Sequence, residues 1–223
     1  DPDRLVSMVR ACIEASDVPV TVKVRLGTGS GPNTAHSIAL RLQDEGVFRI
    51  AVHGRTLRQR YAGEADWEEI GEMVRDLSIP VVANGDVKDA DTAARCLAVT
   101  NAAGLMIGRA AIGNPDIFFR IKKGLGWKFN PAPWHQFVSD ASSEGKEAAI
   151  KLWCWKRYCE LADETYGDRR NNHLKRHAIS FTKGLEGASD MRVKLHRTQG
   201  PNELIQSVTD FLEQSMQSTK IMI

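Results

Sequence analysis

The first 125 residues alternate short β-branched segments with amphipathic helical segments, and this alternation limits the possible folds most strongly. The predicted strands are Val18–Arg25, Phe48–His53, Ile79–Ala83 and Ala103–Ile107. The predicted helices, with apolar residues at helical spacing, are Arg4–Ala15, Thr34–Glu45, Asp66–Leu77, Lys88–Leu97 and Pro115–Gly124. Such an order predicts an α/β fold of parallel strands joined by crossover helices. An open doubly wound sheet and a (β/α)₈ barrel both satisfy it.

The strand pattern stops after residue 126, and the remainder of the chain is helical in pattern. Prolines 131 and 133 mark residues 127–133 as a linker. The helices predicted beyond it are Trp134–Thr165 with a break near Gly145, Arg169–Lys183, Ala188–Leu195 and Pro201–Gln214. We therefore expect an α/β domain over residues 1–126 and an all-α helical bundle domain over residues 134–223.

The composition bears on the cellular compartment of the protein and on whether it has a metal site. No apolar run approaches the ~20 residues of a membrane span, and the first residues do not have the pattern of an export signal. The four cysteines form no C-x-x-C pair and have no zinc-like histidine spacing, so we expect no metal site. Cys12, Cys96 and Cys154 fall in helical patterns and are expected to be buried apolar residues. A reducing, cytoplasmic location fits these features.

The positive charge of the chain is concentrated in one segment. Residues 168–197 hold eight basic and three acidic residues, a net charge of +5 in a chain whose total is +2. This asymmetry indicates a polyanionic partner for the helical half, although a solvated helix surface is an equal alternative on charge alone.

The carboxyl ends of parallel strands carry the ligands in such folds, and here they carry polar residues. Lys23 and Arg25 share one face of the first strand, where an unpaired cation is costly unless it meets an anion or reaches solvent. The second strand ends in His53-Gly54-Arg55, which suits an anionic or heteroaromatic ligand.

The third and fourth strands each end in a glycine turn. Asn84-Gly85-Asp86 follows the third and Gly108-Arg109 follows the fourth. Two consecutive turns of this kind favour a phosphate site built from backbone N–H groups and one guanidinium. Alternatively, each is an ordinary turn, with Asp86 capping the helix that follows.

Together these segments resemble the tRNA-dihydrouridine synthases in order and spacing, from residue 1 to about residue 125. The matching motifs are Val20-Thr21-Val22-Lys23-Val24-Arg25, His53-Gly54-Arg55-Thr56, Tyr61-Ala62-Gly63, Ala65-Asp66-Trp67, Ala83-Asn84-Gly85-Asp86, Met106-Ile107-Gly108-Arg109 and Gly113-Asn114-Pro115. A looser similarity to the family's C-terminal helical domain continues in Leu174-Lys175-Arg176-His177 and Met191-Arg192.

The resemblance implies the C-terminal half of an FMN-binding TIM (β/α)₈ barrel, with the four strands as its fifth to eighth. It implies that Lys23 contacts the pyrimidine edge of the flavin and that His53 lies beside the ring. The residues implied to hold the FMN phosphate are Asn84, Gly85, Asp86, Gly108 and Arg109.

The implied reaction reduces a tRNA uridine to 5,6-dihydrouridine, with NADPH reducing the flavin and a cysteine protonating C5. The base must leave its stack to reach the flavin, and the basic helical segment would bind tRNA phosphates. Arg55 and Tyr61 are predicted to border the uridine. The predicted tRNA contacts are Arg169, Arg170, Lys175, Arg176, Lys194 and Arg197.

The family's cysteine motif, of the type Asn-x-Gly-Cys-Pro, is absent from this sequence, so no catalytic residue is assigned. We therefore expect a truncated chain, or one completed by a companion chain, that is inactive and binds FMN poorly alone. Open sheet edges predict self-association. The alternatives are a non-catalytic RNA-binding remnant and an FMN-barrel reductase of a free pyrimidine.

Overall fold

A computed structural model describes residues 1–138 and 145–217, and these residues form two compact units. The first comprises residues 1–110 and 123–126, and the second comprises residues 111–122 and 127–223, of which 139–144 and 218–223 lie outside the described ranges. Residues 111–122, expected with the strands, thus group with the second unit.

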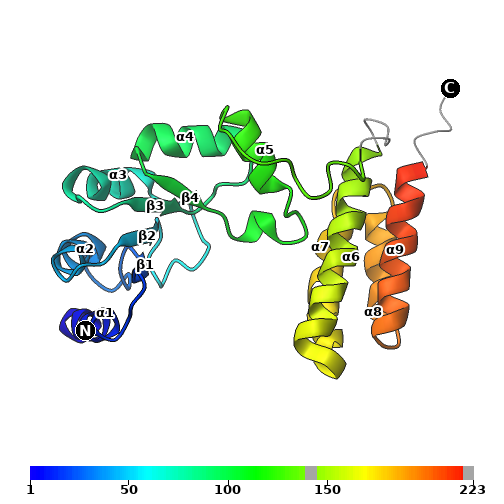
Figure 1. Cartoon of the computed structure of the whole chain (residues 1–223), viewed down its shortest axis with the longest axis horizontal. Coiled ribbons are helices and arrows are strands. Elements are labelled where there is room, and N and C mark those ends of the chain that lie inside the picture. The colour runs from blue at the N-terminus through cyan, green and yellow to red at the C-terminus, as the bar shows by residue number, and fades with distance from the viewer. Residues whose placement is uncertain (139–144, 218–223) are drawn as a thin grey trace. The chain divides into compact units, whose positions relative to one another are not determined.

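The first unit is an α/β structure with a four-stranded parallel sheet (Figure 1). Its strands are β1 (Thr21–Arg25), β2 (Arg49–His53), β3 (Val81–Asn84) and β4 (Gly104–Met106). Its helices are α1 (Pro2–Glu14), α2 (Ala35–Asp44), α3 (Trp67–Asp76) and α4 (Ala90–Thr100). The predicted order of elements is therefore confirmed in this part of the chain.

The strands lie in the sheet in the order β1-β2-β3-β4, which is their order in the chain. A doubly wound sheet contains a point where the order reverses, so this arrangement differs from that alternative. Helices α2, α3 and α4 lie on one side of the sheet (Figure 1). On that side the two central strands are buried, with Ile50, Val52 and Ala83 fully inaccessible to solvent, whereas Val22 and Val24 of β1 are only partly buried. The polar strand-end residues Lys23, Arg25, His53 and Asn84 share the other face, because their positions alternate with these.

Side-chain caps fix the start of α3 and α4, as another does for α1. Asp66 accepts a hydrogen bond from Glu69 N at the start of α3, and Asp89 forms a reciprocal capping box with Thr92 at the start of α4. The alternative in which Asp86 caps this helix is wrong, because Asp89 occupies the N-cap position. The carboxylate of Asp86 is thereby available for other partners.

The prediction that Cys12 is buried is wrong, whereas it is confirmed for Cys96 and Cys154. α1 buries Val6 and Val9, and Cys12 lies in the exposed part of the same helix. Helical spacing places Cys12 on the same apolar face as Val9. Neighbouring elements cover only part of that face, so the spacing alone does not show which of its residues are buried.

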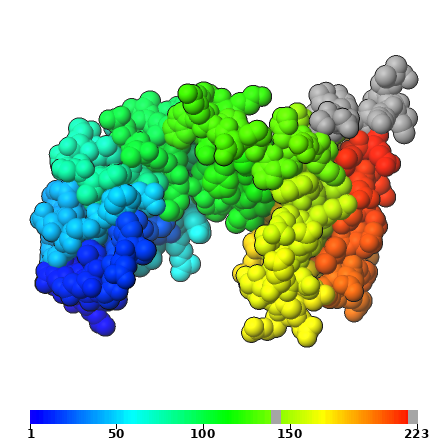
Figure 2. Space-filling view, in the orientation of Figure 1, coloured from blue at the N-terminus to red at the C-terminus, as the bar shows by residue number. Residues whose placement is uncertain are grey.

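The second unit is helical. It holds α6 (Lys146–Tyr166), the short 3₁₀ turn η2 (Gly167–Arg169), α7 (Arg170–Thr182), α8 (Ala188–Arg197) and α9 (Pro201–Gln217). α5 (Ile117–Gly124) begins in this unit, after the 3₁₀ turn η1 (Arg109–Ala111). The surfaces of α6 and α9 lie against each other in Figure 2. The predicted helix over Trp134–Thr165 is wrong over residues 134–138, which form turns, and its part over residues 139–144 lies outside the described ranges.

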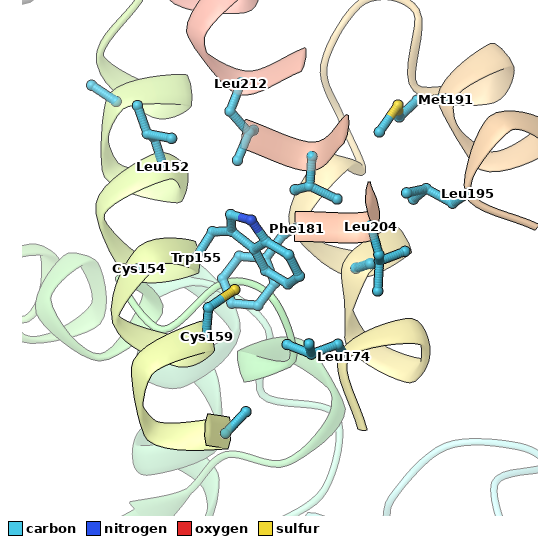
Figure 3. Packing of buried hydrophobic residues seen from close by; sticks show 14 of the residues in the cluster. Leu152, Cys154, Trp155, Cys159, Leu174, Phe181, Met191, Leu195, Leu204 and Leu212 are labelled. Carbon is cyan, nitrogen blue, oxygen red and sulfur yellow. The ribbon is translucent and has the colours of Figure 1, made fainter. Parts of the chain in front are cut away.

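The core of the helical unit forms around Trp155 (Figure 3). Its indole is fully buried and lies edge-on to the ring of Phe181, with centroids 5.3 Å apart. Leu174, Leu204 and Leu212 add fully buried side chains from α7 and α9. Aromatic pairs of this geometry contribute about 0.5–1.5 kcal/mol beyond the burial of their area. Three helices are therefore held on one apolar centre.

Candidate flavin-phosphate site and RNA surface

The carboxyl ends of the four strands form one row across the sheet. Arg25 pairs in register with His53, His53 with Asn84, and Asn84 with Met106. Neighbouring positions of parallel strands direct their side chains to the same face. The predicted site residues of these strands therefore lie at one edge of the sheet and on its helix-free face.

Two cations lie at the first strand of this row. Arg25 donates through Nη1 to the carbonyls of Thr56 and Arg60, at 3.0 and 3.1 Å. Lys23, two residues earlier, is exposed, and its pKa is lowered first by partial burial and then by the charge of Arg25. The partner of His53 in the register is Arg25, and Lys23 pairs with Ala51. An anion bound at this edge would relieve the repulsion between the two cations.

His53 is buried, with 7% of its surface exposed. The pKa of its imidazole is lowered from 6.5 to about 4. Burial is the largest cause, and the charges of Arg25, Lys23 and Arg55 act in the same direction, while Asp86 opposes them. The ring is therefore neutral at pH 7. A neutral imidazole offers one N–H donor and one acceptor nitrogen to a ligand.

The turn after β3 has a left-handed backbone at Gly85 (φ +123°) and at Asp86 (φ +55°). A Cβ on Gly85 would lie 2.6 Å from Ala65 Cβ and 3.2 Å from the His53 ring, so only glycine fits. Asn84 Nδ2 donates to the carbonyl of Met106 at 2.7 Å, which ties this turn to β4.

Arg55 is placed differently from its prediction as a residue bordering the uridine. Its side chain is 2% exposed, and its guanidinium donates to both carboxylate oxygens of Asp86 at 2.9 and 2.7 Å. It also donates to the carbonyls of Ala62 and Gly63. Each of these contacts is with a protein group.

Arg109, after β4, is a second exposed cation at this edge, besides Lys23. More than half of its side chain (56%) is accessible, and its Nη2 lies 3.4 Å from Asp86 Oδ1. Its guanidinium carbon lies 4.4 Å from the centroid of the exposed Tyr61 ring, a cation–π contact. A Cβ on the neighbouring Gly108 would meet nothing within 4 Å. Open space beside a backbone N–H and a guanidinium is the setting that a phosphate requires.

The predicted tRNA residues fall into two groups in the helical unit. Arg170 is 20% exposed and pairs with Asp163 at 3.2 Å, and Lys175 donates to the carbonyl of Thr198 at 3.1 Å. The exposed group consists of Arg169, Arg176, Lys194 and Arg197. On α8 the sequence reasoning left out Arg192 and His196, which are equally exposed beside Lys194 and Arg197. The charge of the 168–197 segment included Arg192 and could have identified it.

A parallel α/β unit with glycine turns and cations at its strand ends belongs to the class of parallel α/β proteins, in which ligand sites generally lie at the carboxyl ends of the strands. The sequence model described as "Dihydrouridine synthase (Dus)" matches residues 1–218. This chain belongs to the dihydrouridine synthase family.

Curated relatives carry matching names. The chain is 32% identical over 215 residues to "Probable tRNA-dihydrouridine synthase 1" of Synechocystis sp., covering 96% of this chain and 56% of the relative. It is 41% identical over 154 residues to "Probable tRNA-dihydrouridine synthase" of Rhodobacter capsulatus, covering 69% and 48%. It is 40% identical over 202 residues to "Probable tRNA-dihydrouridine synthase" of Rhizobium leguminosarum bv. phaseoli, covering 88% and 58%. The chain therefore spans between about half and three fifths of the length of these relatives.

Among residues 1–138 and 145–217, no helix is long and apolar enough to cross a membrane. In the same ranges, no cluster of three histidine, cysteine or acidic side chains has the geometry of a metal site.

Proposed function

We propose that this chain contributes to the FMN- and NADPH-dependent reduction of uridine to 5,6-dihydrouridine in tRNA. Residues 1–126 would form the second half of a (β/α)₈ barrel, residues 127–133 a linker, and residues 134–223 a tRNA-binding helical domain. The strand order β1-β2-β3-β4 and the helices on one side of the sheet support the barrel half. In a (β/α)₈ barrel the strands follow one another in chain order, and all the helices lie outside the strands.

The observation that carries the proposal is the row formed by Arg25, His53, Asn84 and Met106. The residues that would bind the ring and the two turns that would bind the phosphate follow from this row at one edge. Lys23 and His53 lie toward one end of the row, and the two glycine turns lie toward the other. A flavin nucleotide has a heteroaromatic ring at one end and a phosphate at the other, so its chemistry matches this order.

The phosphate end fits FMN. Arg109 offers an accessible guanidinium, and Gly108 leaves room for close approach to the backbone. Asn84, Gly85 and Asp86 would contribute the shape and N–H groups of their turn. The carboxylate of Asp86 is occupied by Arg55, which reduces its repulsion of a phosphate.

The ring end fits a heteroaromatic ring that gains negative charge when it is reduced. Lys23 would lie at the pyrimidine edge, where its ammonium stabilises negative charge, and the neutral His53 would lie beside the ring. When bound, reduced flavin supplies the hydride for the C5–C6 double bond, and NADPH restores it. None of the four cysteines lies in the family's cysteine motif, so the proton for C5 is not assigned to a residue of this chain.

The helical unit would bind tRNA through phosphate contacts. Its accessible cations are Arg169, Arg176, Lys194 and Arg197, supplemented by Arg192. Arg170 and Lys175 would act mainly by shaping this surface, because each has a protein partner. Tyr61, exposed beside Arg109, would border the uridine.

The test is a gene deletion in the native host, followed by measurement of dihydrouridine in individual tRNAs by mass spectrometry. We expect dihydrouridine to disappear from at least one position and to return on expression of the wild-type gene. Lys23→Ala should fail to restore it, whereas Lys128→Ala, which removes an exposed lysine elsewhere in the chain, should restore it fully. Unchanged dihydrouridine in the deletion strain would contradict the proposed function.

A further inference from the structure

Arg55 combines a buried charge with the most extensive set of contacts at the strand ends. Its side chain is 2% exposed and is among the largest fully buried side chains of the described residues. A buried guanidinium is costly unless its donors and its charge are satisfied. Its partners therefore indicate why an arginine is placed there.

The contacts of Arg55 join three consecutive strand-end loops. Its carbonyl accepts a hydrogen bond from Leu26 N, after β1, at 3.2 Å. Within its own loop after β2, Nε donates to the carbonyl of Ala62 at 3.2 Å and Nη2 to that of Gly63 at 2.6 Å. Across the sheet edge, Nη1 and Nη2 bind the two oxygens of Asp86, after β3.

Asp86 lies between two guanidiniums that hold it unequally. Arg55 binds it with two hydrogen bonds of 2.9 and 2.7 Å, and Arg109 approaches one oxygen at 3.4 Å. Ala65 N adds a third short bond, at 2.7 Å, to the oxygen shared with Arg55 Nη2. Burial alone would raise the pKa of Asp86, but the hydrogen bonds from Arg55 and Ala65 outweigh it and hold the pKa below the ordinary value. The carboxylate is therefore charged, and most of its bonding capacity is used by Arg55 and Ala65.

Removal of Arg55 would change the partner of this carboxylate. Arg109 is the neighbouring cation, already within 3.4 Å, and would be drawn into a closed ion pair with Asp86. Its charge would then be cancelled beside the phosphate position. The left-handed turn at Gly85 and Asp86 would also lose its two-point attachment to the loop after β2.

We infer that Arg55 is a positioning residue for the cofactor phosphate: by binding Asp86 it keeps Arg109 available to the phosphate. This inference rests on the proposed function, since it requires a phosphate-bearing flavin at this edge. It gives Arg55 no contact with the flavin or the uridine.

The test compares FMN with riboflavin, which has the same ring and lacks the phosphate. Dissociation constants for both are measured by quenching of flavin fluorescence on the complete protein that contains this chain, and thermal unfolding is recorded for every variant. The wild type should prefer FMN. Arg55→Gln should weaken FMN binding by roughly tenfold, as expected for the loss of a charge-assisted interaction, and leave riboflavin binding unchanged. Arg55→Lys, which keeps the charge without the fork, should lose part of the FMN preference.

Two further variants separate positioning from charge and from folding. Arg58→Gln removes an exposed arginine of the same loop and should leave both affinities unchanged. Arg55→Gln combined with Asp86→Asn leaves no carboxylate to capture Arg109, so it should fold and regain the preference for FMN. This double variant remains informative if Arg55→Gln alone does not fold.

Each result points to a different failure. A complete wild-type protein with no preference for FMN over riboflavin would overturn the proposed function, and the inference with it. A wild type that prefers FMN, with Arg55→Gln showing the same preference, would overturn the inference alone. A folded double variant that binds riboflavin but has lost the preference for FMN would also overturn it, because Arg55 would then act on the phosphate without Asp86.

Discussion

Arg25 and His53 occupy paired positions at the ends of β1 and β2, so that a permanent cation lies beside a buried imidazole. Burial and the surrounding cations, Arg25 first among them, lower the pKa of His53 to about 4. The imidazole is therefore neutral without any bound ligand. A change in the pKa of His53 would report a change in charge at the carboxyl ends of the strands.

The first prediction concerns stability against pH. The folded chain resists protonation of His53, whereas the unfolded chain accepts a proton near pH 6.5. The free energy of unfolding should therefore be fully retained above pH 6.5 and fall as the pH drops toward about 4, by at most about 3 kcal/mol. Urea unfolding at pH 7.0 and at about pH 5 measures this change. His53→Gln should remove most of the difference between the two conditions, and an undiminished pH dependence in that variant would contradict the assignment.

A second prediction follows from ligand charge. A phosphate or an anionic flavin opposes the field of Lys23 and Arg25, so a bound anion should raise the pKa of His53. Titration of the His53 ring proton by NMR, with and without FMN, measures the shift. Riboflavin at saturation serves as the control for the phosphate charge. A pKa of His53 that is unchanged by FMN would place the nucleotide elsewhere.

Thiol reactivity provides a third prediction. Cys12 is exposed, while burial raises the pKa of Cys96 to about 11 and of Cys154 and Cys159 to about 12. Because the thiolate is the reactive form, one cysteine of the native chain should react rapidly with a disulfide reagent at pH 8. Cys12→Ser should abolish the rapid phase, and urea should expose the remaining thiols. Two rapid thiols in the native protein would be incompatible with this burial.

The strands, and the strand ends where the candidate site lies, could be predicted from the sequence because both depend on local patterns. Short apolar runs marked β2 and β3, and the glycine turns after β3 and β4 are visible as short motifs. The place of Arg55 was not predictable in this way, because its burial depends on Asp86, 31 residues later in the chain. Cys12 was misplaced for a related reason: helical spacing gives the apolar stripe, but the neighbouring elements decide how much of it is covered.

A fourth prediction concerns the stability cost of a side chain at Gly113, where the backbone lies close to that of α7. Gly113 has φ +67°, and a Cβ there would lie 2.6 Å from Ser180 O and 2.7 Å from Phe181 N. Gly126 has the same φ, with nothing within 4 Å of its Cβ position. Gly126→Ala should cost about 1 kcal/mol of stability from backbone strain alone. Gly113→Ala should cost roughly 2–5 kcal/mol because overpacking adds to the strain. Equal losses in urea unfolding would show that α7 yields to the added methyl group.

The fifth prediction tests α8 as the tRNA surface. Arg192, Lys194 and Arg197 are exposed on this helix, whereas Lys156 and Arg157 on α6 pair with Glu213 and Glu160. Substituting the three α8 cations by glutamine should weaken tRNA binding and reduce its dependence on salt. Each lost phosphate contact should lower the slope of log K against log salt by about 0.7–0.9.

The matched control is Lys156→Gln with Arg157→Gln, which removes exposed but ion-paired cations from the same unit. Because their charges are already balanced by glutamates, tRNA affinity and the salt slope should change little. Filter binding or fluorescence anisotropy between 50 and 200 mM salt, a range of about fourfold, resolves the two slopes. If both sets of substitutions lower affinity and slope equally, tRNA would sense only the total charge of the helical unit. If neither does, the RNA surface must lie on other residues of the chain.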